Sequence, residues 1–280
     1  MEQFRLLAGF VPTEENLARQ IWDDPDYEPD LVSGAFVDGN LVGFCIAVRR
    51  PWKRGREDTG YIKWIYVSPE LRRQTIGSQL LRRTESVMQS HGVTELIYGS
   101  SAPLYLWPGV AEQDFATQAL LNKHGWSRGS ERINLTLTLP TTISLIPATV
   151  TEIETRLIAS ADRNNLKEFI TAEFSQSWWQ EIEAIFQPEQ KAFGVIACRE
   201  DQIIGFAATH ATNSNWFGPM GVRHSERGKG IGRQLLLKSV REATVRGSKL
   251  LTIPWVNEEF YNKCLGKLTR QVFVKYSKCV

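Results

Sequence analysis

Short runs of apolar residues that follow polar turns occur at two places about half the chain apart. Residues 41–47 form one such run after the turn at 38–40, and residues 203–209 form the other after 200–202. An apolar run directly after a tight polar turn is typical of the second strand of a β-hairpin. The pattern therefore predicts one hairpin in each half of the chain.

The elements that follow also occur in pairs. Residues 76–81 and 231–236 share the pattern Ile-Gly-x-Gln-Leu-Leu, and each opens a helical pattern that ends near a glycine. Short apolar runs at 95–98 and 250–253 then predict a strand in each copy. Both copies thus have the order hairpin, strand, helix, strand, helix, strand.

This internal repeat predicts the fold class and the domain organisation. Two similar α/β domains are expected, one at about 1–140 and the other at 141–280, with a linker near 139–142. Each half has the usual size of a single domain, ~100–150 residues.

Composition favours an ordinary soluble protein. Of 280 residues, 42% are hydrophobic and 10% aromatic, which excludes disorder as the main state. No window approaches the ~18 uninterrupted apolar residues of a membrane helix, and the first residues lack a signal-peptide pattern. The four cysteines are far apart, so reduced thiols, a cytoplasmic location and no zinc site are expected.

The net charge of +2 gives little of the basic footprint that nucleic-acid binding requires, so no nucleic-acid partner is expected. The halves differ slightly in charge. Residues 1–140 carry 15 basic and 17 acidic side chains, whereas residues 141–280 carry 18 and 14. The small basic excess therefore belongs to the second half.

The most informative segment of that half is residues 216–232. A strand-like stretch contains Gly218-Pro219, and proline cannot donate a ladder hydrogen bond, so a bulge or an edge is expected there. The following loop, 227–232, is rich in glycine and leads into a helix, so its backbone N–H groups can converge on an anion. These features predict a pyrophosphate site, although glycine-rich turns before helices also occur without one.

Residues 227–232, Arg-Gly-Lys-Gly-Ile-Gly, fit the (Gln/Arg)-x-x-Gly-x-(Gly/Ala) motif and resemble the GCN5-related N-acetyltransferase (GNAT) family. The resemblance covers most of 141–280 and includes Phe260-Tyr261-Asn262-Lys263, which is similar to the family's FYxK helix. It implies two tandem domains with mixed, mostly antiparallel central sheets flanked by helices, and acetyl-CoA as co-substrate without a metal. A Rossmann site and a Walker A loop do not fit the glycine spacing.

The resemblance also implies roles for individual residues. Tyr261 would be the general acid that protonates the CoA thiolate, and the N–H of Met220 or Val222 would polarise the thioester carbonyl. Asn257 would bond the pantetheine arm, although it lies closer to Tyr261 than the family's spacing. The full expected cofactor-binding set is Met220, Gly221, Val222, Arg227, Gly228, Lys229, Gly230, Ile231, Gly232, Arg233 and Asn257.

The base and the acceptor pocket stay open at this point. Glu173, Glu181 and Glu226 are the carboxylates near the expected site, and each could equally be an ordinary surface residue. Several aromatic side chains of the second half could line an acceptor pocket or belong to the core. They are Trp178, Trp179, Trp216, Phe217 and Trp255.

The corresponding loop of the first half, residues 72–77, departs from the motif. Thr75 replaces its first glycine, Lys63-Trp64 replaces the Gly-Pro, and Leu121 stands in the position of Tyr261. A domain that kept the fold but lost catalysis is expected, and residual CoA binding by this half stays open.

The sequence thus predicts an acetyl-CoA-dependent N-acetyltransferase with an active C-terminal domain. The acceptor would be the amine of a small molecule or an amino acid, which attacks the thioester directly. The alternative is a non-catalytic acyl-CoA-binding or sensing module. No membrane partner is expected, and the protein would be a monomer or a homodimer.

Overall fold

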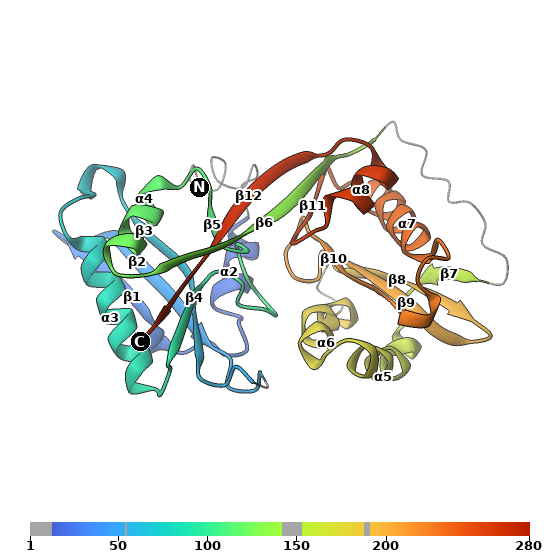
Figure 1. Ribbon diagram of the computed structural model, residues 1–280, viewed down its shortest axis with the longest axis horizontal. Helices are drawn as coiled ribbons and strands as arrows, with labels where there is room; N and C mark the ends of the chain where they lie inside the picture. The colour runs from blue at the N-terminus through green and yellow to red at the C-terminus, as the bar shows by residue number, and fades with distance from the viewer. Residues whose placement is uncertain (1–12, 54, 142–152, 188–190) are drawn as a thin grey trace. The chain divides into compact units, whose positions relative to one another are not determined.

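The computed structural model describes residues 13–53, 55–141, 153–187 and 191–280. The chain divides into two compact units (Figure 1). Unit 1 comprises Met1–Arg132 and Val272–Val280, and unit 2 comprises Ile133–Gln271.

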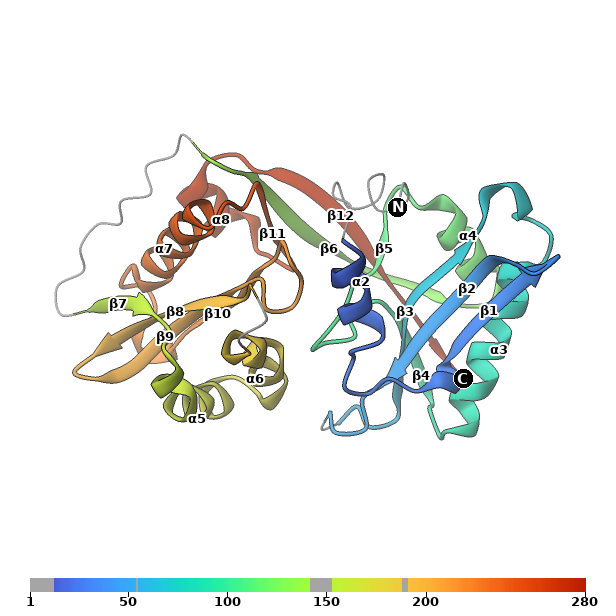
Figure 2. The ribbon, with the colours of Figure 1, turned by 180° about the vertical axis from the view of Figure 1, so that it is seen from behind.

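Unit 1 is built on a mixed sheet in which the strand order is β1-β2-β3-β4-β12. The hairpin β1–β2 and the pair β2–β3 are antiparallel, whereas β3 and β4 are parallel. Helix α3 runs along the first three strands (Figure 2). The elements are α2 (Glu14–Ile21), β1 (Val32–Val37), β2 (Asn40–Arg49), β3 (Thr59–Val67), α3 (Ile76–Ser90), β4 (Glu95–Tyr98), β5 (Val110–Ala111), α4 (Phe115–Lys123) and the first part of β6 (Ser127–Thr138).

Unit 2 repeats this plan after two additional helices. Its antiparallel sheet has the order β10-β9-β8-β7, with α7 on one face and α5 and α6 on the other (Figure 1). A second antiparallel pair joins β11 to the end of β6. The elements are β7 (Glu154–Leu157), α5 (Arg163–Glu173), α6 (Gln176–Ile182), β8 (Phe193–Arg199), β9 (Gln202–Thr209), β10 (Phe217–Val222), α7 (Ile231–Val245), β11 (Leu250–Ile253), α8 (Glu258–Leu265) and β12 (Thr269–Cys279). Short 3₁₀ turns at Pro29–Leu31, Pro69–Leu71, Ser160–Asp162, Glu183–Phe186 and His224–Glu226 complete the two units.

The predicted order of elements is confirmed in both halves, and so is the fold class. The two hairpins turn where polar residues interrupt the apolar runs, and Asp38 and Asp201 adopt the positive φ angles of tight turns. Each unit buries a separate core: Leu81, Leu96 and Phe273 are buried in unit 1, and Val195, Leu235 and Leu251 in unit 2.

The final strand of each repeat joins the sheet of the other unit. Strand β6 begins in unit 1, and its Leu135 and Leu137 pair with β11 of unit 2. Strand β12 follows α8, and its last residues, Ser277–Cys279, pair with β4 of unit 1. The compact units therefore differ from the halves 1–140 and 141–280 at their edges, and that division of the sequence stays a prediction.

None of the described helices is long and apolar enough to cross a membrane. The four cysteines are free thiols, of which Cys45, Cys198 and Cys264 are buried.

Candidate functional site

Strand β10 contains the bulge that Gly218-Pro219 predicts. Phe217 pairs with Thr209, but the next paired residue, Met220, lies opposite Ala207, so two residues of β10 face one of β9. The extra residue disturbs the ladder and bends the strand.

Beyond the bulge, the outer edge of β10 is free of a paired strand among the described residues. The Arg223 N–H donates to the Ile204 carbonyl at 2.8 Å. Because backbone groups alternate along a strand, the N–H groups of Met220 and Val222 point to the opposite edge. Strand β10 is the last strand of its sheet, and a single bridge, Trp216 to Thr252, joins it to β11.

The glycine-rich loop after β10 has the backbone that an anion site needs. Gly228 and Gly230 have φ angles of 79° and 82°, a left-handed conformation that glycine adopts without steric cost. Gly230 is the N-cap of α7 and offers no side chain to the first N–H groups of the helix. Arg227 fixes the loop, since its Nε donates to the Val222 carbonyl at 3.1 Å. The first N–H groups of the helix, which receive no side-chain cap, and the helix dipole therefore favour an anion here.

The acidic residues near the loop are largely engaged. Glu226 accepts from Arg199 at 2.9 Å and from Lys229 at 3.2 Å, and Glu173 pairs with Arg223 at 3.1 Å. Two of the three predicted base candidates are thus ion-pair partners. The third, Glu181, accepts a weak hydrogen bond from Thr212 at 3.4 Å.

Tyr261 lies on α8 beside the start of β10. Its ring centroid is 6.4 Å from that of Phe217 and 5.0 Å from that of Phe260. Phe260 points toward α7, because a Cβ on Gly232 would lie 3.5 Å from the end of its ring. Burial raises the pKa of the half-buried Tyr261 hydroxyl to about 12, so the hydroxyl keeps its proton at neutral pH.

The remaining predicted cofactor residues have mixed surroundings. Ile231 is buried in the core, and Arg233 is half-buried in the first turn of α7. Gly221 packs against Phe174, because a Cβ there would meet the Phe174 ring at 2.4 Å. Asn257 is the N-cap of α8, and its Oδ1 accepts from the Glu259 N–H at 3.1 Å. Its side chain therefore already has a structural partner.

Most of the aromatic candidates for an acceptor pocket belong to the core. Trp179, Trp216 and Phe217 are buried, and Trp178 stacks on Phe174 at 4.9 Å between centroids. Trp255 is the exposed member of the set, at 46%.

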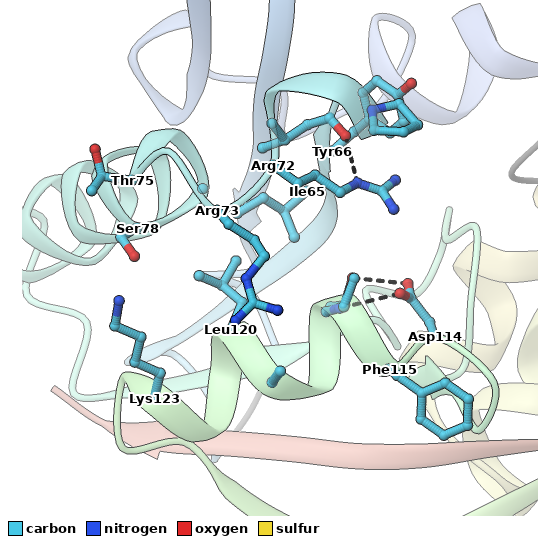
Figure 3. Close-up of a pocket in the computed structure, with 16 residues that line it drawn as sticks. Ile65, Tyr66, Arg72, Arg73, Thr75, Ser78, Asp114, Phe115, Leu120 and Lys123 are labelled. Atoms are coloured by element: carbon cyan, nitrogen blue, oxygen red, sulfur yellow. Dashed lines mark hydrogen bonds between the residues drawn. The ribbon is translucent and has the colours of Figure 1, made fainter.

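Unit 1 repeats the loop with different residues. Arg72 donates from Nε to the Val67 carbonyl at 3.0 Å, as Arg227 does to Val222 in unit 2. Arg73 and Thr75 have φ angles of 63° and 68°, the same left-handed backbone that two glycines supply in unit 2. Beside this loop, α3 and α4 enclose a cavity of about 810 Å³ (Figure 3). The sequence analysis did not predict this cavity. The arginine that begins both loops, Arg72 in unit 1 and Arg227 in unit 2, was the signal that could have indicated it.

The outer edge of β3 in unit 1 differs from that of β10 in unit 2 at the backbone of Ile65, the residue that aligns with Met220. The Ser68 N–H donates to the Val42 carbonyl on β2. Because backbone groups alternate along a strand, the Ile65 backbone points to the other side, toward β4. Burial raises the pKa of the Tyr98 hydroxyl, and a hydrogen bond with the Ile65 backbone opposes this rise. Ile253 stands in the place of Tyr98 in unit 2, so no hydroxyl from that position covers Met220.

The bulge of unit 1 carries a buried ion cluster in place of Gly-Pro. Lys63 is the extra residue of β3, and its ammonium group contacts Asp24. Asp24 also accepts from Arg50, and both of these charged side chains are almost completely buried. The acidic segment 23–29 supplies Asp24 and Asp26 to this cluster, and no sequence pattern indicated that role.

Two family models match the chain. The acetyltransferase (GNAT) family model matches residues 2–105, and a second model, the acetyltransferase (GNAT) domain, matches residues 190–264. No curated protein matches the sequence.

Solved structures of low sequence identity share the fold. A GCN5-related glucosamine N-acetyltransferase region of a fungal multi-domain GH3 β-N-acetylglucosaminidase is 18% identical with a TM-score of 0.76, and the match covers 99% of this chain and 36% of that one. A GCN5-related N-acetyltransferase from Sphaerobacter thermophilus is 17% identical with a TM-score of 0.71, over 95% of this chain and 85% of the other. A tandem GNAT protein from the clavulanic acid biosynthesis pathway is also 17% identical, with a TM-score of 0.69 over 90% and 84%. The chain thus spans about a third of the fungal protein and most of the other two.

Proposed function

Because the chain belongs to the acetyltransferase (GNAT) family, with a family-model match in each half, we propose that its second unit transfers an acetyl group from acetyl-CoA to an amine. The observation that supports the assignment to unit 2 most directly is the free outer edge of β10 beside a left-handed glycine loop. Both features provide backbone N–H groups, which bind a linear, phosphate-bearing co-substrate irrespective of side chains.

The residues of the loop would bind the pyrophosphate. Gly228 and Gly230 let the diphosphate approach the backbone, and Lys229 adds a positive charge at the exposed side. The N–H of Val222 then continues the row of donors along the arm toward the bulge. Asn257 would bond the arm through its side-chain amide nitrogen, because its Oδ1 already accepts from the Glu259 N–H.

The chemical step would use two groups of unit 2. The Met220 N–H donates to the carbonyl oxygen of the thioester, and it stabilises the negative charge that grows there as the neutral amine attacks. The new C–N bond forms while the C–S bond breaks, and Tyr261 donates its proton to the sulfur that leaves. The amine nitrogen then loses its extra proton to water, from which the tyrosine is reprotonated. A tyrosine pKa of about 12 keeps this donor protonated throughout the neutral range.

For the acceptor, we propose the amine of a small molecule or an amino acid. The fungal structural neighbour carries the name of a glucosamine N-acetyltransferase region, so an amino sugar belongs in the acceptor set that is tested.

The test is release of free thiol from acetyl-CoA in the presence of amino sugars, amino acids and alkylamines. Tyr261→Phe is expected to lower kcat by about 10²-fold or more with little change in acetyl-CoA binding, as for loss of a general acid. Tyr66→Phe removes the hydroxyl of a half-buried tyrosine on β3 of unit 1, which has no part in the proposed transfer, and is expected to leave the rate unchanged. CoA binding without turnover for any amine would contradict the proposal and favour a non-catalytic acyl-CoA-binding module.

A further inference from the structure

We infer that Glu28, Asp30 and His91 of unit 1 form a binding site for a divalent metal ion that prefers nitrogen and oxygen ligands, such as Zn²⁺. One possible ligand atom from each side chain lies within 4.8 Å of the other two. The His91 Nε2 is 2.8 Å from the Asp30 Oδ2, and the His91 Nδ1 is 4.0 Å from the Glu28 Oε2. Ligand atoms that each lie ~2.0–2.2 Å from one zinc ion are separated from one another by ~3–4 Å. Small rotations of the three side chains therefore bring them around a single ion.

The set of donors selects the class of metal. An imidazole nitrogen with two carboxylate oxygens suits zinc and its neighbours in the transition series, whereas Ca²⁺ and Mg²⁺ take oxygen ligands. Three protein ligands leave a position on the ion for water. The cysteines, from which no zinc site was expected, take no part in this cluster.

The backbone on both sides of the cluster is anchored. His91 is the C-cap of α3, and its N–H donates to the Val87 carbonyl at 3.2 Å and to the Met88 carbonyl at 3.1 Å. Glu28 is the N-cap of the 3₁₀ turn Pro29–Leu31, which contains Asp30 and ends at a leucine that is buried in the core of unit 1. The three ligands thus extend from two fixed elements, and their side chains supply the adjustment that metal binding needs.

Arg49 holds one of the carboxylates in place. Its Nε and Nη2 donate to the two oxygens of Glu28 at 3.0 Å and 2.8 Å. Each carboxylate oxygen has two lone pairs, so Glu28 can keep both bonds and still offer a lone pair to an ion. Partners of this kind orient metal ligands in proteins. Two carboxylates against one guanidinium also leave a net negative charge that favours a cation.

The imidazole and Asp30 are already in contact through the atoms that would bind the metal. The hydrogen bond with His91 lowers the pKa of Asp30, so this carboxylate is ionised at neutral pH. An ion that enters the cluster takes the place of the proton between the two groups, as metal binding to histidine generally does. The side chains of Glu28, Asp30 and His91 are 27%, 53% and 28% exposed, so an ion reaches them directly from solvent.

A metal here would join parts of the chain that are far apart in sequence. Asp30 precedes β1 directly, and His91 ends α3, 61 residues later. An ion that binds both in the folded state, but not in the unfolded chain, stabilises unit 1 by mass action. The expected role of the site is therefore structural, and it is independent of the transfer proposed for unit 2.

The test is calorimetric titration of the full chain with ZnCl₂. The unmodified chain is expected to bind one Zn²⁺ more than His91→Gln, and Asp30→Asn is expected to weaken the same site at least about tenfold. The matched control His224→Gln removes an exposed histidine of unit 2 and should keep the site. ZnCl₂ should also raise the melting temperature of the unmodified chain and of the control, but not that of His91→Gln. MgCl₂ should produce neither effect at the same concentration.

Three results would overturn the inference. Zinc binding that is unchanged in both His91→Gln and Asp30→Asn would show an adventitious ion only, held elsewhere on the chain. Equal losses in His91→Gln and His224→Gln would reduce the effect to the number of histidines. Binding of MgCl₂ as tightly as ZnCl₂ would show an acidic surface without a part for the imidazole. His91→Gln is expected to leave thiol release by unit 2 unchanged, so failure of the metal site and failure of the proposed transfer are distinguishable.

Discussion

The buried ion cluster of unit 1 shows how one residue changes the character of a strand bulge. Arg50 uses all of its donors: it bonds Asp24 and Asp26, and it also bonds two backbone carbonyls, those of Ser101 and Ala102. Burial lowers the pKa of Lys63 to about 8, although Asp24 opposes this shift. For Arg50 the same burial is outweighed by the two aspartates, and the pKa is raised. The arginine is therefore the better stabilised cation of the cluster.

Arg50→Met is expected to destabilise unit 1 by about 3–5 kcal/mol, because two acidic side chains would then share one lysine in a buried place. Lys63→Met is expected to cost clearly less, since Asp24 keeps its two bonds to Arg50. Urea unfolding of both variants measures the difference. A larger loss for Lys63→Met than for Arg50→Met would contradict this account of the cluster.

His210 makes the stability of unit 2 depend on pH. Burial lowers the pKa of its imidazole to about 4, from an ordinary value of 6.5. Between these values the unfolded chain binds more protons than the folded one, so stability is lost as pH falls from 6.5 toward 4, by about 3 kcal/mol at most. His210→Asn should remove this dependence, since asparagine tolerates the positive φ of 61° and does not titrate. Unfolding curves at pH 7 and pH 4.5 measure it, with the exposed His224→Asn as the control that should behave like the unmodified chain.

At the scale of elements, the two loops show the same backbone built from different residues. In unit 2 the left-handed positions are glycines, whereas unit 1 places Arg73 and Thr75 there. A β-branched residue with φ of 68° is strained, because its side chain approaches the backbone. The loop shape is thus held by the strand and helix on either side and by the bond from Arg72 to Val67, and not by local preference.

Thr75→Gly is expected to stabilise unit 1 by about 0.5–1 kcal/mol, because relief of left-handed strain exceeds the extra chain entropy of glycine. Gln74→Gly is the matched control, since Gln74 lies between the two left-handed residues without a positive φ itself. That variant should lose stability. Thermal unfolding compares them, and a lower melting temperature for Thr75→Gly would show that the loop is not strained.

The sequence allowed the order of elements, the bulge at Gly218-Pro219 and the glycine loop to be predicted, because each depends on residues that are close together in the chain. The cavity of unit 1 could not be predicted in the same way. It depends on the distance between α3 and α4 and on which side chains point between them. The hydrogen bond between Ile65 and Tyr98 joins residues of two strands, and no local pattern indicates it.

At the scale of the whole molecule, the final strands show that a sequence repeat and a structural unit do not contain the same residues. The apolar pattern of β12 predicts a strand, but it does not indicate its partner, because the same alternating face can pack on either core. Phe273 and Val274 of β12 are buried in the core of unit 1, although they belong to the second repeat. Leu135 of β6 is buried in the core of unit 2, although it belongs to the first.

This exchange predicts that the stability of each unit depends on the last strand of the other repeat. Phe273→Ala removes a side chain that is 2% exposed and is expected to cost about 3–5 kcal/mol, all of it in unit 1. Hydrogen exchange should then become faster in β3 and β4 and stay unchanged in β8 and β9, since local opening follows the unit that loses its packing. Leu135→Ala is the reciprocal change and should accelerate exchange in unit 2. If Phe273→Ala instead loosens α8 and β11 of its own repeat, the last strand stabilises the repeat that encodes it, and the exchange of strands is not the arrangement that holds the cores together.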